Sequence, residues 1–183
     1  MHEVAERCPT FVGVSPPCTY FSTIQRFNHA KRHRVTAPSV LDRERDEAYC
    51  FLNFAMQLCQ IQHAAGRFFY HEHPRKATSW QVASVRDVSI LPGVVQVPFE
   101  QCSLGLIAYD GTPIEKQTTI MTNSTVLADR LRLCKCTCTT PHFRIGGNIP
   151  GTSVSVAAAA AVYPPPMRRL LAESVLEEHK LRK

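Results

Sequence analysis

The 183-residue sequence is poor in glycine, with 8 glycines where average usage of about 7% would give roughly 13. It contains neither a Gly-x-Gly-x-x-Gly loop nor a phosphate-binding loop. Such loops let a backbone approach a pyrophosphate closely at the start of a helix. The sequence therefore offers no glycine-rich nucleotide site of the usual kind.

Long apolar runs are also absent. The longest, residues 154–163, is rich in alanine and far shorter than the roughly 18 residues that a membrane span needs. The first seven residues lack the apolar core of a signal peptide. Eight cysteines are too few and too scattered for a disulfide scaffold, so reduced thiols are expected. We predict an intracellular protein, nuclear or cytoplasmic, that does not bind membranes.

Hydrophobic residues make up 44% of the chain, which is typical of a globular protein. The length indicates one domain, expected at 10–178, between an amino-terminal tail at 1–9 and a basic tail at 179–183. The net charge of +6 permits nucleic-acid binding but does not require it. Four basic residues gather in a segment expected to be a loop: Arg26, Lys31, Arg32 and Arg34.

The amino-terminal half has the pattern of a βαβ unit. Residues 10–14 form a short apolar run that ends at two prolines, which predicts a buried strand. Apolar residues at helical spacing predict a helix over about 40–64, with Ser39 and Asp42 as its capping box. The aromatic run at 67–71 predicts a second strand. Strand, helix and strand in this order indicate parallel strands.

The carboxyl-terminal half continues the same fold class. Segments 94–97 and 116–121 predict two strands, and an Asp-Gly turn between them predicts a hairpin. Helices are expected over 124–133 and after the prolines at 164–166. We therefore expect an α/β fold: a partial Rossmann-like sheet of parallel strands plus a carboxyl-terminal hairpin, with helices on its faces.

Two reactive side chains follow the first two predicted strands. Cys18 comes after the Ser-Pro-Pro turn, and Glu72 comes after the aromatic strand. The carboxyl ends of parallel strands share one edge of a sheet, where ligands collect, so the two side chains are expected to meet there. A thiolate and a carboxylic acid together can add to an electron-poor ring. The alternative is that Cys18 is a buried structural cysteine.

Two sets of residues have side chains that bind metals. His71 and His73 alternate along the second strand but lack an obvious third ligand, so surface histidines are the alternative there. Cys134, Cys136, Cys138 and His142 make the ligand set of a structural zinc site. Their Cys-x-Cys-x-Cys-x3-His spacing is unusual for zinc, and free thiols in a loop are the alternative.

The sequence resembles the cytosine-C5 methyltransferases at three motifs. Pro16-Pro17-Cys18-x-x-Phe21-Ser22 is similar to the motif whose cysteine attacks C6 of a flipped-out cytosine. Glu72 matches the glutamate that contacts ring N3, and the resemblance makes Ser15, Pro17 and His73 candidates for substrate binding. Residues 157–162, followed by Tyr163 and Pro164, resemble the small-residue strand and proline-started helix that complete the pocket for S-adenosylmethionine.

A narrower resemblance concerns divergent methyltransferase-like modules of retroelement polyproteins and large viruses. The most specific match is the nine-residue run Glu72-His-Pro-Arg-Lys-Ala-Thr-Ser-Trp80, and the matches Gln101-Cys-Ser-Leu-Gly105 and Thr122-Asn-Ser124 follow in the same order. The resemblance covers about residues 10–175 and only the carboxyl-terminal half of the fold. The half with the glycine-rich cofactor loop has no counterpart here.

The resemblance implies a methyltransferase-like fragment from a mobile element, with little activity alone. Cys18 would be its nucleophile, Glu72 its acid, and the basic loop its contact with nucleic-acid phosphates. Its partner would be the missing amino-terminal half of the same polyprotein. A non-catalytic nucleic-acid-binding or structural module is one alternative, and a zinc-stabilised module built on residues 134–142 is another.

Overall fold

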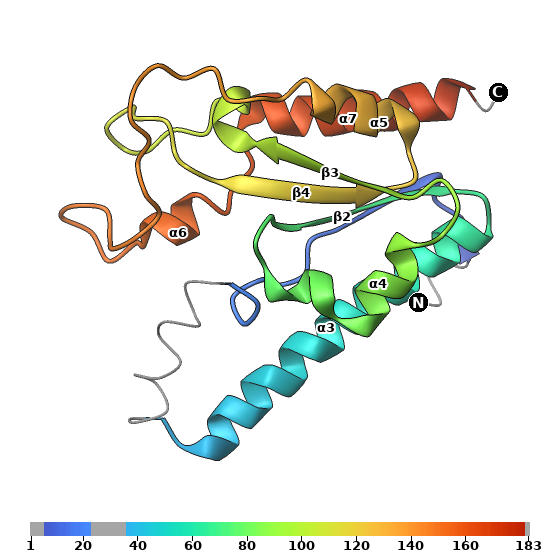
Figure 1. Ribbon diagram of the computed structural model, residues 1–183, viewed down its shortest axis with the longest axis horizontal. Coiled ribbons are helices and arrows are strands. Elements are labelled where there is room, and N and C mark those ends of the chain that lie inside the picture. Colours follow the sequence, from blue (N-terminus) through green and yellow to red (C-terminus); the bar gives the residue numbers. More distant parts are fainter. Residues whose placement is uncertain (1–5, 23–35, 182–183) are drawn as a thin grey trace. The chain divides into compact units, whose positions relative to one another are not determined.

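A computed structural model describes residues 6–22 and 36–181 of the chain. The basic residues of the predicted phosphate-binding loop (Arg26, Lys31, Arg32 and Arg34) lie outside the described residues. Figure 1 shows helices and strands in this order along the chain: β1 (Phe11–Val14), α3 (Pro38–Ala64), β2 (Phe68–Pro74), η1 (Thr78–Gln81), α4 (Ala83–Ser89), β3 (Val95–Glu100), η2 (Gln101–Leu104), β4 (Gln117–Thr122), α5 (Thr125–Arg132), α6 (Val156–Ala159) and α7 (Pro165–Leu181).

The chain divides into two compact units. Among the described residues, the first unit comprises 6–22, 36–96 and 119–124, and the second unit comprises 97–118 and 125–181. The prediction of a single domain over 10–178 stays a prediction.

The strands form one mixed sheet of four, in the order β1-β2-β4-β3. β1 and β2 are parallel, with Phe11 opposite Phe68 and Val14 opposite His71, and the other neighbours are antiparallel. The predicted α/β class is therefore confirmed, with the parallel pair where the βαβ pattern requires it. The narrower Rossmann-like assignment remains an expectation.

Helix α3 begins at Pro38, two residues before the start that a cap at Ser39 predicts. Pro38 occupies the first turn, the cap residue Ala37 makes no side-chain cap bond, and Asp42 instead accepts a hydrogen bond from Arg45 at 2.9 Å. The predicted capping box is therefore wrong, because the fixed φ of proline already suits the first helical position. The carboxyl end of the helix, at Ala64, agrees with the prediction of about residue 64. Gly66 follows it with φ +63°, a conformation typical of a glycine after a helix.

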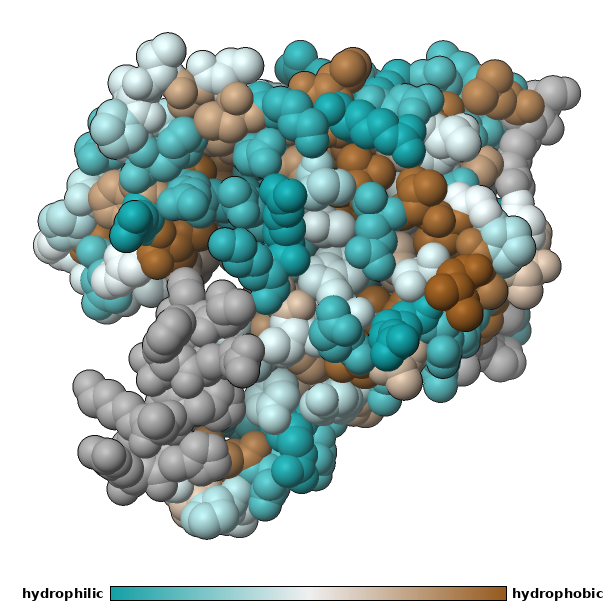
Figure 2. Space-filling model, viewed as in Figure 1, coloured by the Kyte–Doolittle hydropathy of each residue, from teal (hydrophilic) through white to brown (hydrophobic). Residues whose placement is uncertain are grey.

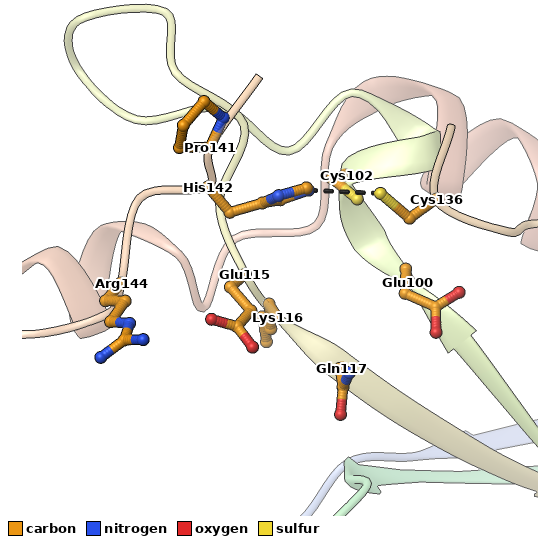
Figure 3. Close-up of a pocket in the computed structure, with 9 residues that line it drawn as sticks. All are labelled: Glu100, Cys102, Glu115, Lys116, Gln117, Cys136, Pro141, His142 and Arg144. Atoms are coloured by element: carbon orange, nitrogen blue, oxygen red, sulfur yellow. Dashed lines mark hydrogen bonds between the residues drawn. The ribbon is translucent and has the colours of Figure 1, made fainter. Parts of the chain in front are cut away.

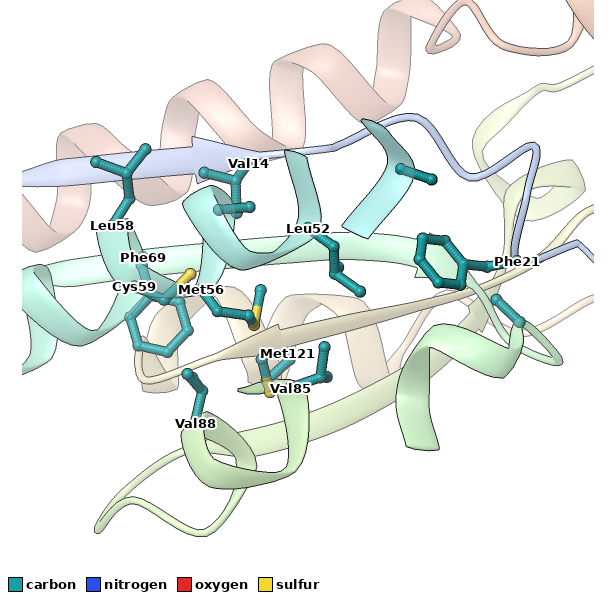
Figure 4. Packing of buried hydrophobic residues seen from close by; sticks show 13 residues of the cluster. Val14, Phe21, Leu52, Met56, Leu58, Cys59, Phe69, Val85, Val88 and Met121 are labelled. Carbon is teal, nitrogen blue, oxygen red and sulfur yellow. The ribbon is translucent and has the colours of Figure 1, made fainter. Parts of the chain in front are cut away.

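The core of the first unit lies between α3, α4 and the strands β1 and β2 (Figure 4). Leu52 and Cys59 of α3, Phe69 of β2, and Val85 and Val88 of α4 are all fully buried. Each large apolar side chain buried in this way contributes roughly 1.5–3 kcal/mol relative to an exposed one. This packing holds the two parallel strands, and so the residues at their carboxyl ends, in fixed register.

The second unit has α5 packed along α7. Leu127, Leu131 and Met167 are fully buried, and the guanidinium of Arg130 donates to the carboxylate of Glu177 at 2.6 Å. A second apolar cluster forms around Leu106, Ala108, Ile114 and Ala160, with Phe143 and Ile145 against it.

The predicted Asp-Gly turn is present, but it closes a short bridge within the β3–β4 connection and does not join the two strands directly. Gly111 has φ +83°, and the carboxylate of Asp110 accepts the Thr112 N–H at 2.9 Å, which lowers the pKa of Asp110. The turn joins the two sides of a single antiparallel bridge between Ile107 and Pro113.

The alanine-rich segment after Ser155 differs from the resemblance, which implied a small-residue strand at 157–162. The structure has the short helix α6 there instead. The Ser155 hydroxyl accepts the Ala158 N–H at 3.1 Å and caps this helix. A serine cap and successive alanines both favour a helical turn over a strand.

The surface mixes apolar and polar residues. On the face in Figure 2, hydrophobic patches are separated by hydrophilic residues. Scattered exposed apolar side chains of this kind are usual for folded proteins. None of the helices within 6–22 and 36–181 combines the length and the apolar character needed to cross a membrane.

Candidate functional site

The first candidate site lies at the carboxyl ends of β1 and β2 in the first unit. Val14 is the last paired residue of β1 and stands opposite His71, so the register brings Ser15 to the level of Glu72. Ser15 and Pro17 are exposed, Cys18 is half-buried, and Glu72 is 8% exposed. The loop that carries the thiol and the strand end that carries the carboxyl group therefore leave the sheet at the same edge.

His73 fastens the proline turn that precedes Cys18. Its Nε2 lies 3.0 Å from the Pro16 carbonyl oxygen, and its Nδ1 lies 2.6 Å from the Ser79 hydroxyl. Because a carbonyl oxygen only accepts, Nε2 carries the proton and donates, which leaves Nδ1 to accept from Ser79. The ring is 1% exposed, and this burial lowers the pKa of His73 to about 4. His73 is therefore neutral at pH 7 and uses both nitrogens within the protein.

The residues after Cys18 are tied to the start of η1. The Phe21 N–H donates to the Cys18 carbonyl at 3.0 Å, and the Phe21 carbonyl accepts the Thr78 N–H at 2.9 Å. The Phe21 ring is 1% exposed and packs edge-on against Tyr49 of α3. Cys18 thus lies on a turn whose two sides are both held by the 72–80 run.

Hydrogen bonds also connect residues within the nine-residue run 72–80. Besides the His73–Ser79 bond, the Ala77 N–H donates to the Pro74 carbonyl at 3.0 Å, and the Trp80 indole N–H donates to the same carbonyl at 2.9 Å. The residues that the family resemblance singled out therefore form the local structure that supports the Cys18 turn.

His71 is the one histidine of this region without polar partners in the described residues. It is fully buried, neither ring nitrogen has a hydrogen-bond partner, and its ring lies against those of His73 and Trp80. Burial, and to a lesser extent His73, lower the pKa of His71 far below its usual range. The histidine pair does not belong to any group of three or more potential metal ligands within the described part of the chain.

The carboxyl group of Glu72 shares this environment. Burial, and secondarily the charge of Glu72, raise the pKa of the neighbouring Tyr70 hydroxyl. Glu72 itself is 8% exposed, so its carboxyl group lies largely out of solvent at this edge of the sheet.

The candidate cofactor contacts, Tyr163 and Pro164, belong to the second unit. They stand immediately before α7, with Tyr163 half-buried and Pro164 buried. No described strand-to-helix turn carries a glycine-rich loop, so the described residues do not fit S-adenosylmethionine.

The second candidate site is a group of three thiols and one imidazole in the second unit. The ligand atoms of Cys102, Cys136, Cys138 and His142 all lie within 4.8 Å of one another. The Cys136 sulfur is 3.3 Å from Nε2 of His142, as Figure 3 shows. Three of the four residues singled out as possible zinc ligands are therefore together.

Cys134 does not belong to this group, and Cys102 takes its place. The Cys134 thiol is buried and donates to the Arg130 carbonyl at 3.5 Å. Cys102 lies in η2, and the Glu100 N–H just before it donates to the Cys134 carbonyl at 3.2 Å. Sequence spacing does not single out Cys102, because its position depends on the end of β3 lying beside the loop.

The protonation of the thiols reflects their closeness. Burial and the neighbouring thiols raise the pKa of Cys102 to about 12, whereas hydrogen bonding from the Cys138 backbone and from Cys102 lowers the pKa of Cys136. A cavity of about 480 Å³ adjoins the group, and charged side chains including Glu100, Glu115 and Arg144 line it (Figure 3).

No protein-family model, curated protein or solved structure matches this chain.

Proposed function

We propose that the first unit is the pyrimidine-attacking part of a cytosine-C5 methyltransferase-like fold. In this proposal Cys18 is the nucleophile and Glu72 is the general acid. The observation that supports it is that β1 and β2 end at the same edge of the sheet. There the hydrogen bond from His73 to the Pro16 carbonyl holds the Pro16-Pro17-Cys18 turn beside the strand end with Glu72.

The chemistry requires only groups of this unit and water. The Cys18 thiolate adds to C6 of cytosine while the Glu72 carboxyl group donates its proton to ring N3. The resulting enamine takes a proton from water at C5. Loss of the original C5 proton, return of the N3 proton to Glu72 and elimination of the thiolate then restore cytosine. The net reaction exchanges the C5 hydrogen with solvent.

The turn and its supports have properties that suit this role. The thiol is half-buried on a turn fixed at both sides, so that little conformational freedom is lost when the ring is attacked. His73 is neutral at pH 7, so it adds no positive charge next to the Glu72 carboxyl group. Substrate phosphates would be bound by Arg26, Lys31, Arg32 and Arg34, as the sequence predicts.

The test is hydrogen exchange at cytosine C5, measured as tritium release from 5-tritiated cytosine in single-stranded and double-stranded DNA. We expect release by the full chain, none with Cys18→Ser, and a loss of roughly 100-fold with Glu72→Gln. The matched control is Cys50→Ser, which changes an exposed thiol on α3. An oligonucleotide with 2-pyrimidinone in place of cytosine should give a covalent adduct at Cys18, detected by intact mass.

Release that persists in Cys18→Ser would overturn the assignment. Absence of both release and adduct in a folded chain would do the same. If the chain then binds the same DNA in a salt-dependent way, and Cys18→Ser binds equally well, the result would support the non-catalytic binding module.

A further inference from the structure

The cysteine–histidine group of the second unit has the composition of a zinc site. Three thiols and one imidazole are soft and borderline ligands that favour zinc over magnesium or calcium, which prefer oxygen. Four protein ligands also leave no position open for a substrate, which is typical of structural rather than catalytic zinc.

The distances between the four ligand atoms are close to those found around a bound zinc ion. In a tetrahedral site with Zn–S bonds of about 2.3 Å and a Zn–N bond of about 2.0 Å, neighbouring ligand atoms lie roughly 3.5–3.8 Å apart. The Cys136–His142 pair is at 3.3 Å, and no pair in the group exceeds 4.8 Å. Side-chain adjustments of about 1 Å would therefore complete the tetrahedron.

The backbone around the group positions the ligands independently of any metal. The Glu100 N–H donates to the Cys134 carbonyl at one end of the loop. At the other end, the Phe143 N–H donates to the Pro113 carbonyl at 2.7 Å, and the Glu115 N–H donates to the Phe143 carbonyl at 3.0 Å. Cys136, Cys138 and His142 lie between these two attachments, so the hydrogen bonds hold the loop against η2 and Cys102.

The loop that carries three of the ligands is attached by backbone hydrogen bonds and by the packing of Phe143 and Ile145, but it has no core of its own. Not one of residues 135–155 is buried, and the segment contains only isolated β-bridges and turns. Ordering a chain segment that has no core of its own costs conformational entropy. Other interactions must offset this cost, and binding of a metal ion is one of them. An ion bound by Cys102 and the loop would connect residues more than thirty positions apart in the sequence.

We propose that Cys102, Cys136, Cys138 and His142 bind one structural zinc ion that fastens the 135–155 loop to η2. The proposal concerns the second unit and does not depend on the function proposed for Cys18 and Glu72.

The test begins with the wild-type full chain. Elemental analysis after purification without chelators should give one zinc per chain, and X-ray absorption at the zinc edge should give three sulfur ligands at about 2.3 Å and one nitrogen. Replacement by Co²⁺ should produce thiolate-to-cobalt charge-transfer bands of tetrahedral intensity. These measurements do not require any variant to fold.

Variants then distinguish Cys102 from Cys134. We expect Cys102→Ser and His142→Ala to weaken zinc binding by roughly 100-fold or more in a competition with a chromophoric chelator. Cys134→Ser, the matched control next to the loop, should keep one zinc with unchanged affinity, and so should Cys50→Ser.

Three results would overturn the proposal. The first is a folded chain that binds no zinc when refolded in its presence. The second is a disulfide between any two of the three cysteines in protein prepared under reducing conditions. The third is loss of zinc in Cys134→Ser with retention in Cys102→Ser, which would support the ligand set given by spacing alone.

Discussion

The two units stabilise their candidate sites by different means. In the first unit, a 27-residue helix buries a continuous apolar cluster against the parallel strands, and the side chains around Cys18 are linked by hydrogen bonds within the protein. In the second unit, no residue of the 135–155 loop is fully buried, and this loop carries three of the four clustered potential metal ligands. The Cys18 site therefore depends on apolar packing beneath it, whereas the thiol group depends on the side chains that could bind an ion.

The largest test of this contrast is the truncation of a core aromatic residue. Phe69→Ala removes a fully buried ring from the first unit and should lower its free energy of unfolding by roughly 3–5 kcal/mol. Hydrogen exchange of the α3 amides would measure the loss. Phe51→Ala on the same helix, where the ring is 46% exposed, is the control and should cost about 0.5 kcal/mol or less. Equal effects of the two substitutions would contradict the packing described for α3.

Acid should weaken the first unit through its buried histidines. The pKa of His73 falls from 6.5 in the unfolded chain to about 4 in the folded one, so the unfolded state binds the proton more readily. The corresponding stability, about 3 kcal/mol, is complete above pH 6.5 and is lost progressively as the pH falls to about 4. Unfolding in urea between pH 4 and 8, followed by circular dichroism, would measure this slope.

The slope should become shallower in His73→Gln, although this variant also loses stability at neutral pH. His179→Gln, at the exposed surface of α7, is the matched control. A slope that is unchanged by His73→Gln would show that burial of this imidazole does not cause the acid sensitivity.

His71→Leu should stabilise the first unit. The substitution removes two buried nitrogens that have no hydrogen-bond partner in the described residues, each of which costs about 1–3 kcal/mol when unsatisfied. We expect a gain in stability of about 1–2 kcal/mol and loss of part of the acid slope. Chemical denaturation at pH 7 would measure the gain, and a destabilisation above 1 kcal/mol would indicate a partner for the imidazole.

Gly13→Ala should have a moderate effect on the parallel pair. A Cβ at Gly13 would overlap the end of the Tyr70 ring on the adjacent strand. Because the ring is half-buried and can turn aside, we expect a loss of roughly 1–2 kcal/mol rather than failure to fold. A thermal unfolding curve would measure the loss, and the double variant with Tyr70→Ala should cancel most of the steric part. An additive double variant would exclude this contact as the cause.

The smallest effect is expected at the surface of the second unit. Arg130→Ala removes the ion pair with Glu177. The Arg130 side chain is 32% exposed and the Glu177 side chain is 47% exposed. Exposed pairs of this kind contribute about 0–1 kcal/mol and are screened by salt. The difference between variant and wild type should therefore shrink in 1 M NaCl, and a loss above 2 kcal/mol would mean that Arg130 has a larger structural role.

The parts of the fold that sequence reasoning predicts well are those that follow hydrophobic periodicity. The strand at 10–14, the helix that became α3 and the order strand–helix–strand all follow from apolar spacing, which burial against a sheet imposes. β2 extends three residues beyond its predicted end at His71, to Pro74, because Glu72 and His73 are buried polar residues, which an apolar pattern does not count.

Site residues could be brought together from the sequence only where the hydrophobic pattern of neighbouring elements already fixes the order and direction of the strands. Cys18 and Glu72 could be assigned to one edge because parallel strands end together. Cys102 could not be assigned to the thiol group, because its place depends on how a loop more than thirty residues away returns to the end of β3. The alanine-rich segment was assigned to the wrong structure because alanine is small in both a strand and a helix, and the cap at Ser155 decides for the helix.

The bond between the Trp80 indole and the Pro74 carbonyl gives this protein a built-in optical reporter. Trp80 is the only tryptophan in the chain, and its ring lies 5.3 Å from that of His71. The tryptophan fluorescence of the protein therefore comes entirely from the 72–80 run that supports Cys18. A protonated imidazole beside an indole quenches the emission of that indole. Ligand binding, acid and substitution at this edge can each be followed by emission from that single ring, without labelling the protein.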